Sequence, residues 1–343
     1  MDQNNKKVSI IIVNWNNAED LKRCIESLIK ISYKKIEIVI VDNGSTDDSI
    51  DEIKKIQKRK KHFFLIQNKK NLGFAQGNNI GYAKTTGEFV LFLNNDTVVT
   101  KNFLEPLVAK IKESPNIAGV QPKILQYPKK NIIDSVGSYF ITSGFLYHYG
   151  HNKKDKKEYN KESEIYSMKG ACMLFKKEVL EKIGVFDSDY FAYFEETDIC
   201  HRAWVAGYKI LFTSKSFIYH RGGQTAKRLP SSFILYHSYK NRIYTYLKNF
   251  QLTTILKIIP LHILFCQIVS LVYCFTLQFP LAFAVQKAIL WNILHAHITV
   301  KKRSKVQELR KVSDDLYIWN ISRHVRVSYY YHLFTTSLRG YKD

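Results

Sequence analysis

The sequence predicts an α/β protein with a mostly parallel sheet in its first two thirds and helices in its last third. Short apolar runs rich in β-branched residues recur without polar alternation, which is typical of strands buried on both faces. Amphipathic segments separate these runs with short connections, as in repeated strand–helix–strand units. The last third is different, because residues 258–286 contain no Asp, Glu, Lys or Arg.

Taken in order, the apolar runs predict four strands over residues 8–13, 36–41, 63–66 and 89–93. Helical spacing or capping residues predict the intervening helices over 18–31, after 47, and from about 71 to 84. Beyond these we expect a helix over 102–113, a strand over 117–120, an irregular segment over 122–160, a strand over 167–175, helices over 177–183 and 195–207, and strands over 209–212 and 216–219. The irregular segment is either a flap over a binding site or an exposed insertion.

Length and charge set broad limits. A chain of 343 residues accommodates a catalytic domain and an appendage. The net charge of +22 predicts attraction to polyanions such as an anionic membrane surface or phosphorylated substrates. No nucleic-acid-binding motif accompanies it, so nucleic acid is not an expected partner. The five cysteines lack metal-binding spacing and are expected to be buried in a reducing compartment.

Three chemically distinctive residues stand where predicted strands end: Trp15, Asp42 and Asp96. The carboxyl ends of parallel strands form the ligand crevice of open α/β folds. We therefore expect a nucleotide site, with Trp15 stacking on a base and Asp42 accepting a hydrogen bond from a base or ribose. The Asp96 carboxylate suits a hard divalent cation that shares ligands with substrate phosphates. A turn after the strand, which Asn94, Asn95 and Asp96 also favour, is the alternative.

Two common nucleotide-binding classes, Rossmann dehydrogenases and P-loop enzymes, are disfavoured. Neither G-x-G-x-x-G nor GxxxxGK[ST] follows the first strand, where Asn14-Trp15-Asn16-Asn17 stands instead. A nucleotidyltransferase also uses an acidic metal site on an α/β sheet, but it needs a phosphate-binding loop that this segment does not provide.

Four ordered motifs carry a family resemblance: residues 8–16 (VSIIIVNWN), 41–47 (VDNGSTD), 71–79 (NLGFAQGNN) and 93–97 (LNNDT). Together they resemble family 2 glycosyltransferases, most closely the rhamnosyltransferase-like branch, over roughly residues 8–223. The resemblance implies a GT-A fold, a nucleotide-diphosphate sugar donor, Mn²⁺ or Mg²⁺, and inversion at the anomeric carbon. Its catalytic domain would span 1–228, with a donor half over 1–121 and an acceptor half over 122–228. The remainder, 229–343, would be a helical appendage.

The resemblance also implies site residues. Asp96 takes the last position of the family's DxD-type metal motif, although Asn94 replaces its first acid. The Gly170-Ala171 step would lie under the donor sugar. His220, which precedes a glycine-rich segment, would be a second metal ligand, and a structural role for this lone histidine is the alternative. The implied donor contacts are Val13, Asn14, Trp15, Asp42, Asn71, Gly73, Asn78, Asn94, Asn95, Gly170 and Ala171.

A second chemical centre is Glu195-Glu196-Thr197-Asp198, which opens a predicted helix. Acids favour a helix N-terminus, but crowded carboxylates beside aromatic residues also raise one another's pKa, as a general base requires. Glu196 takes the family's base position, and Glu195 is the alternative. The predicted catalytic residues are Glu196, Glu195 and Asp198, and Asp198 is expected to hold Arg202 one helical turn away.

The charge-free stretch is long enough to span a bilayer, but both of its flanks are basic. Because a single span favours charge asymmetry, we expect a re-entrant or surface-embedded helical pair on the cytoplasmic face of the membrane. A true span and a soluble dimerisation pair are the alternatives. The polar N-terminus carries no signal peptide pattern, which also predicts a cytoplasmic catalytic part.

These observations predict an inverting, metal-dependent glycosyltransferase that extends a cell-surface glycan, with a polyprenyl-phosphate-linked acceptor. A catalytically silent, membrane-attached protein that binds sugar nucleotides is the alternative, because Asn94 and Glu196 depart from the family's motifs. The sequence does not identify the sugar, base, acceptor, linkage or oligomeric state.

Overall fold

The computed structural model describes residues 6–57, 62–223 and 228–330. Within these residues, one mixed sheet has the order β10-β12-β6-β11-β4-β1-β2-β3, with β5 paired to β12 and β7 to β6, and β8 and β9 form a separate hairpin. The strands are β1 (Val8–Asn14), β2 (Ile36–Asp42), β3 (Phe63–Gln67), β4 (Phe89–Leu93), β5 (Thr97–Val99), β6 (Ile117–Gln126), β7 (Ile133–Ser135), β8 (Ser138–Phe140), β9 (Leu146–His148), β10 (Ser163–Glu164), β11 (Cys172–Lys176) and β12 (Lys209–His220).

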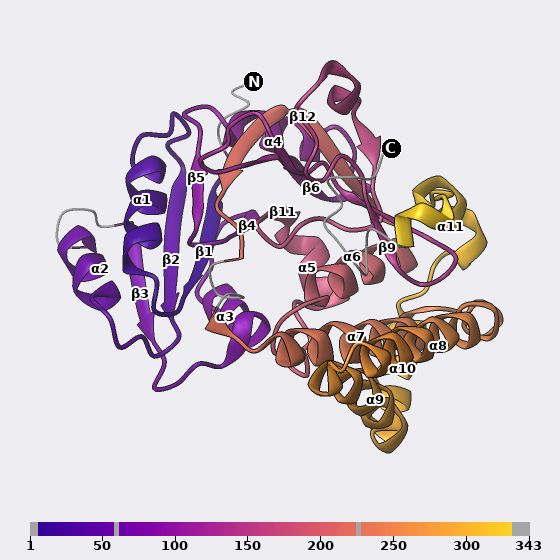
Figure 1. Ribbon diagram of the computed structural model, residues 1–343. Coiled ribbons are helices and arrows are strands. Elements are labelled where there is room, and N and C mark those ends of the chain that lie inside the picture. Colours follow the sequence, from indigo (N-terminus) through magenta and orange to yellow (C-terminus); the bar gives the residue numbers. More distant parts are fainter. Residues whose placement is uncertain (1–5, 58–61, 224–227, 331–343) are drawn as a thin grey trace.

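Helices cover the sheet and form the C-terminal part of the described chain (Figure 1). They are α1 (Ala18–Leu28), α2 (Ser49–Gln57), α3 (Gly73–Tyr82), α4 (Leu104–Lys112), the 3₁₀ helix η1 (Lys157–Asn160), α5 (Lys177–Ile183), α6 (Glu195–Val205), α7 (Ser231–Asn249), α8 (Leu252–Phe275), α9 (Phe279–Leu294), α10 (Ala296–Glu308) and α11 (Asp314–Ile321).

The first half confirms the predicted parallel sheet. Strand β1 lies between β2 and β4, and β3 continues the sheet beyond β2, all in parallel. Successive residues of β1 point to opposite faces, so Ile10 and Ile12 pack with α1 and α4, whereas Ile11 packs with α3 in the other cluster. Burial of both faces explains why these strands are apolar without alternation.

The second half of the sheet contains both parallel and antiparallel strands and corrects two expectations. Strand β11 runs antiparallel between β4 and β6 and begins at Cys172, later than the predicted residue 167. The two strands predicted over 209–219 form one strand, β12, whose register shifts between Thr213 and Phe217. The polar residues there interrupt the apolar pattern, but a local irregularity absorbs them without ending the strand.

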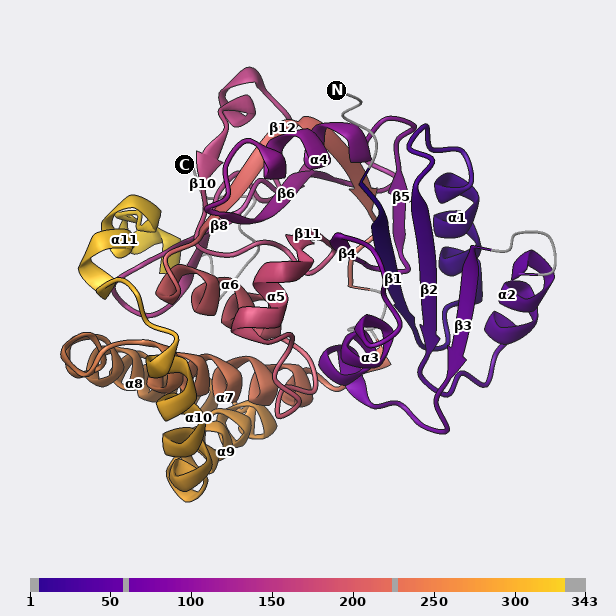
Figure 2. The same ribbon diagram turned by 180° about the vertical axis from the view of Figure 1, so that it is seen from behind.

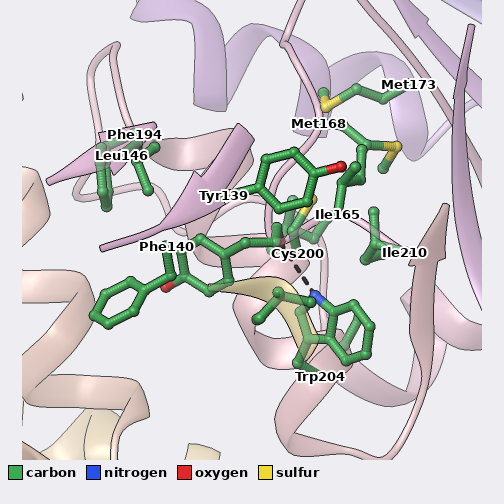
Figure 3. Packing of buried hydrophobic residues seen from close by; sticks show 14 of the residues in the cluster. Tyr139, Phe140, Leu146, Ile165, Met168, Met173, Phe194, Cys200, Trp204 and Ile210 are labelled. Atoms are coloured by element: carbon green, nitrogen blue, oxygen red, sulfur yellow. Dashed lines mark hydrogen bonds between the residues drawn. The ribbon is translucent and has the colours of Figure 1, made fainter. Parts of the chain in front are cut away.

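The segment predicted to be irregular is largely buried. It contains β7, β8 and β9, and Ile133, Tyr139 and Phe140 are at most 2% exposed. An exposed insertion is therefore the wrong description for residues 133–148, which contribute to the larger hydrophobic cluster. Figure 3 shows this packing around Tyr139, Phe140 and Trp204.

The C-terminal helices share that cluster. Helices α7 to α10 lie together beside α5 and α6, and α11 returns to β8 (Figures 1 and 2). Tyr246 of α7, Val285 of α9 and Tyr317 of α11 pack with residues of the acceptor half in one core. The division at residue 228 into two domains stays a prediction.

The charge-free stretch forms two helices, α8 and α9, separated at residues 276–278. Within the described residues, α8 is the one helix long and apolar enough to cross a membrane by length and composition, a property that some core helices share. Four of the five cysteines are buried as expected, but Cys274, near the end of α8, is exposed. The expectation of five buried cysteines is wrong at that position because it lies on the uncovered side of α8.

Candidate functional site

A cavity of about 690 Å³ lies between the strand ends and the start of α6. Its strand wall follows β1 and β4 and consists of Val13, Trp15, Asn94, Asn95 and Asp96. Its loop wall consists of Phe191, Ala192, Tyr193, Phe194, Glu195 and Glu196. The remaining predicted site residues that line the cavity are Asn71, Gly73, Gly170, Ala171 and His220.

Asn14 and Asp42 lie beneath the strand wall and do not line the cavity. The Asp42 carboxylate is buried and accepts hydrogen bonds from the Ser45 hydroxyl (2.6 Å) and the Asn14 amide (3.2 Å). Asn14 in turn accepts a hydrogen bond from the Asn95 side chain at 2.6 Å. Asp42 therefore fixes the loop after β2, and its predicted contact with a base or ribose stays a prediction.

Asn78 lies inside α3, where its amide donates to the Phe74 carbonyl at 2.9 Å. The same helix begins at Gly73, whose φ is +82° and where an added Cβ would lie 2.3 Å from the Phe191 carbonyl oxygen. Only glycine fits at this point, where α3 meets the loop wall.

The Gly170-Ala171 step lies beside the strand wall because β11 pairs with β4. Cys172 is opposite Leu93, and the backbone N–H of Asn94 donates a hydrogen bond to the Ala171 carbonyl at 3.0 Å. A Cβ added at Gly170 would lie 4.0 Å from the Cβ of Glu196, so this step separates the two walls.

Asp96 and His220 meet because β5 pairs with β12, with Thr97 opposite His220. His220 Nε2 lies 3.2 Å from Asp96 Oδ1, and Nδ1 is hydrogen-bonded to Asp134 Oδ2 at 2.8 Å. Burial alone would lower the pKa of His220, but the carboxylates of Asp96 and Asp134 outweigh it and raise the pKa to about 10. The paired carboxylates thus make this part of the cavity favour a positive charge.

The glutamate pair opens α6 inside the loop wall. Burial and the neighbouring Glu196 raise the pKa of Glu195 well above its usual value. Burial also raises the pKa of Glu196, although Lys169 opposes this. Glu195 Oε2 is buried without a hydrogen bond to any described residue, whereas Glu196 accepts one from the Thr197 hydroxyl at 3.3 Å. A carboxyl with a raised pKa holds a proton more readily than an ordinary one, as a general base requires.

Asp198 points away from the cavity. It is fully buried and bonds to Arg202 at 3.0 Å, which confirms the predicted pair, and its other oxygen contacts Lys248 and Asn249 at 2.9 Å. Burial would raise the pKa of Asp198, but Lys248 and Arg202 lower it.

The structure adds residues that sequence reasoning missed. Asp134, His148, His151 and Lys169 all line the cavity. Lys169 Nζ lies 3.7 Å from Asp134 Oδ1, and burial together with Lys169 lowers the pKa of His148 to about 3. Lys169 precedes the Gly170-Ala171 step and could have been noticed there. Asp134 and the histidines lie in the segment that had no recognisable pattern.

Comparisons with known proteins identify a matching family and several relatives. A family model described as "Glycosyl transferase family 2" matches residues 9–184. The low-salt glycan biosynthesis hexosyltransferase Agl10 of Haloferax volcanii is 28% identical over 247 residues, which cover 68% of this chain and 74% of that protein. The match spans only 24% to 35% of the next curated relatives.

Two solved structures share the fold. The mannosyltransferase PcManGT from Pyrobaculum calidifontis, in complex with GDP-Man and Mn²⁺, has a TM-score of 0.55 at 14% identity and covers 92% of this chain and 87% of its own. GalNAc-T7 with UDP, GalNAc and Mn²⁺ has a TM-score of 0.58 at 21% identity, and the match covers 71% of this chain and 48% of GalNAc-T7. These likenesses confirm the predicted GT-A fold, and at this identity they show the fold alone.

Proposed function

The chain belongs to glycosyl transferase family 2, and we propose that it transfers a sugar, with inversion, from a nucleotide-diphosphate donor to a hydroxyl of a glycan acceptor. The observation that carries the proposal is the pairing of two chemistries across one cavity. Asp96 and His220 stand near the strand wall, and the glutamate pair stands in the loop wall. Such an arrangement can bind a diphosphate on one side and accept a proton on the other.

The strand wall suits the nucleotide. Trp15 lines the cavity and would stack on a base, and Asn43 and Asn71 line the same cavity. Asp42 supports the strand wall by fixing the loop that carries Asn43. Complexes of the two structural neighbours with GDP-Man and with UDP support a sugar nucleotide as donor. Rhamnose is the sugar that the resemblance to the rhamnosyltransferase-like branch suggests.

Asp96 and His220 would hold a divalent cation, Mn²⁺ or Mg²⁺. Asp96 Oδ1 is buried and lies 3.2 Å from His220 Nε2. A carboxylate oxygen, which Mn²⁺ and Mg²⁺ favour, and an imidazole nitrogen would therefore converge on the cation once the imidazole has released its proton. Asp134, bonded to Nδ1, would keep Nε2 turned toward the ion. Within the described residues, no group of three His, Cys, Asp or Glu side chains is arranged to hold a metal ion, so donor phosphates would complete the coordination. When bound, the cation neutralises charge on the departing diphosphate.

Glu196 is the proposed general base. In-line displacement breaks the bond between the anomeric carbon and the phosphate oxygen and forms the bond to the acceptor oxygen, while the hydroxyl proton moves to Glu196. Glu196 is the less buried of the pair and faces Gly170. Burial raises the pKa of Glu196, and the neighbouring Glu196 carboxylate adds to the effect of burial in raising the pKa of Glu195. Asp198 anchors α6 through Arg202 and Lys248.

The acceptor is proposed to be a polyprenyl-phosphate-linked glycan at the cytoplasmic face of the membrane, in cell-surface polysaccharide synthesis. Large apolar side chains are exposed along α8 and α9, namely Leu252, Leu256, Leu264, Leu271, Phe275, Phe279 and Phe283. Exposed lysines flank them at positions 257, 287, 301 and 305. An apolar surface with a basic border suits an anionic bilayer. In a flotation assay, the protein should float with phosphatidylglycerol vesicles. Failure to bind either anionic or neutral vesicles would contradict the proposed membrane attachment.

The function is tested by nucleoside-diphosphate release from UDP-, dTDP- and GDP-sugars with Mn²⁺ or Mg²⁺ and extracted membrane lipids as acceptors. The wild type is compared with Asp96→Ala and Glu196→Gln, and with Glu181→Gln on the exposed side of α5 as a control. We expect metal-dependent release from one donor, lost in the first two variants. Donor binding without release from any donor would favour the catalytically silent alternative, and no donor binding would refute the proposal.

A further inference from the structure

The loop wall contains an unfavourable backbone conformation. Tyr193 and Phe194, which immediately precede the glutamate pair, have φ values of 70° and 74°. Aromatic residues rarely adopt this left-handed region, and each costs about 1–3 kcal/mol. Phe194 is also the N-cap of α6 and provides no side-chain hydrogen bond to the helix. The position of the glutamates therefore depends on contacts from elsewhere.

Helix α7 supplies those contacts from one face. Residues four apart along the helix each contact the segment from Tyr190 to Asp198. Phe233 and His237 pack on the Phe191 ring, with centroids 5.7 and 5.8 Å away. Asn241 bonds the loop backbone, the Thr245 hydroxyl bonds Tyr190, and Asn249 bonds Asp198. The spacing matches the helical repeat, so the whole face of α7 follows this segment.

Asn241 has the most specific contact in this row. Its fully buried amide donates to the carbonyls of Ala192 (2.9 Å) and Tyr193 (2.6 Å). In an extended chain successive carbonyls point to opposite sides, so one amide could not reach both. The left-handed conformation at Tyr193 turns them to the same side. The two hydrogen bonds thus select the turn itself.

We propose that Asn241 is a positioning residue that holds this turn and thereby directs the glutamate pair into the cavity. The proposal rests on the proposed transfer reaction and adds a role for α7, which lies beyond the residues that the family model matches. Arg242 and Tyr246 support it by packing on the Phe194 ring, at 5.2 and 5.8 Å from its centroid.

The test compares Asn241→Ala with Asn292→Ala. Asn292 is also a buried asparagine of the C-terminal helices and donates two hydrogen bonds, to the carbonyls of Lys240 and Ala288, but it does not contact the loop. We expect Asn241→Ala to lower kcat about 100-fold, because a displaced base loses its alignment, while the KM and Kd for the donor stay unchanged. Asn292→Ala should keep the wild-type kcat. Asn241→Ser retains one donor and should give an intermediate kcat if the alanine variant fails to fold.

Amide hydrogen exchange gives a second readout that does not require turnover. Exchange should rise over residues 190–198 in Asn241→Ala and not in Asn292→Ala. A wild type without transfer activity would refute the proposed function, and the exchange pattern would still decide whether Asn241 holds the turn. Wild-type kcat in Asn241→Ala, or equal losses and equal exchange in both alanine variants, would overturn the positioning role.

Discussion

The strand wall and the loop wall of the cavity are held in place by different means. Residues of the strand wall directly follow parallel strands, whose backbone hydrogen bonds fix them, and the buried chain from Asn95 through Asn14 to Asp42 connects them below. The loop wall combines two left-handed aromatic residues with buried carboxyls and is secured by side chains of α7, such as Asn241, 48 residues after Tyr193. A single distant side chain can therefore displace the loop wall, whereas the strand wall depends on many backbone contacts.

The largest expected effect separates the two glutamates within the loop wall. Glu196→Gln removes the proposed base and should lower kcat by about 10²–10⁴-fold, with donor affinity retained. Glu195→Gln keeps the base and should lower kcat far less. Steady-state kinetics and donor titration measure both. The opposite order would transfer the role of base to Glu195.

A buried ion pair tests how strongly the loop wall depends on α7. Lys248 contacts Asp187 at 2.7 Å and Asp198 at 2.9 Å, and its side chain is 2% exposed. Lys248→Met leaves both carboxylates with fewer partners and should lower the free energy of unfolding by roughly 3 kcal/mol. Burial would raise the pKa of Asp187, but Lys248 and Lys302 outweigh it and lower the pKa below the usual 3.8. This stabilisation is therefore present above that value and is lost as the pH falls below it.

The matched change near the first strands is Lys7→Met. Lys7 contacts the buried Glu37 at 2.6 Å, but its own side chain is 41% exposed and Glu37 keeps hydrogen bonds from Ser9 and Thr86. Chemical denaturation should show a smaller loss here than in Lys248→Met. Equal losses would mean that the two regions do not differ in their dependence on single side chains.

Gly73→Ala tests the point where α3 meets the loop wall. An added Cβ would lie 2.3 Å from the Phe191 carbonyl, and φ is +82°, so the substitution should cost about 2 kcal/mol through strain and displacement. Gly223→Ala is the control, since φ is +69° but no atom of the described residues lies within 4 Å of the added Cβ. Thermal unfolding should show the larger decrease in Tm for Gly73→Ala. A similar decrease in both would attribute the effect to backbone conformation alone.

The smallest expected effect is a pH shift that reports on the glutamate pair. Because the pKa of Glu196 is raised, kcat should fall as the pH drops through a value above the usual 4.5. Glu195→Gln replaces a carboxyl whose pKa is raised further than that of Glu196 with a neutral amide, so it should leave this acidic limb in place. For stability the sign is reversed, since groups with raised pKa favour the fold below their unfolded pKa and lose that contribution as the pH rises. A limb that moves to lower pH in Glu195→Gln would contradict this, because it would mean that Glu195 carries a negative charge where Glu196 titrates.

Most of the strand wall could be predicted because its determinants are local. Apolar β-branched runs define β1, β2 and β4, and the polar residues after them fall at the sheet edge by geometry alone. The pair of Asp198 and Arg202 follows from helical spacing in the same way. The amphipathic helices and the pair of helices in the charge-free stretch were also visible in the pattern.

The sequence by itself therefore determined the fold class, the family, the strand-end residues and the presence of a carboxylate centre. The tertiary structure decided which of these meet. Asp134 contacts His220 across 86 residues, Asn241 contacts the turn at Tyr193 across 48, and Asp42 lies beneath the cavity. Periodicity and turn chemistry act over a few residues and encode elements. Contacts such as these depend on how completed elements pack, which no short pattern specifies.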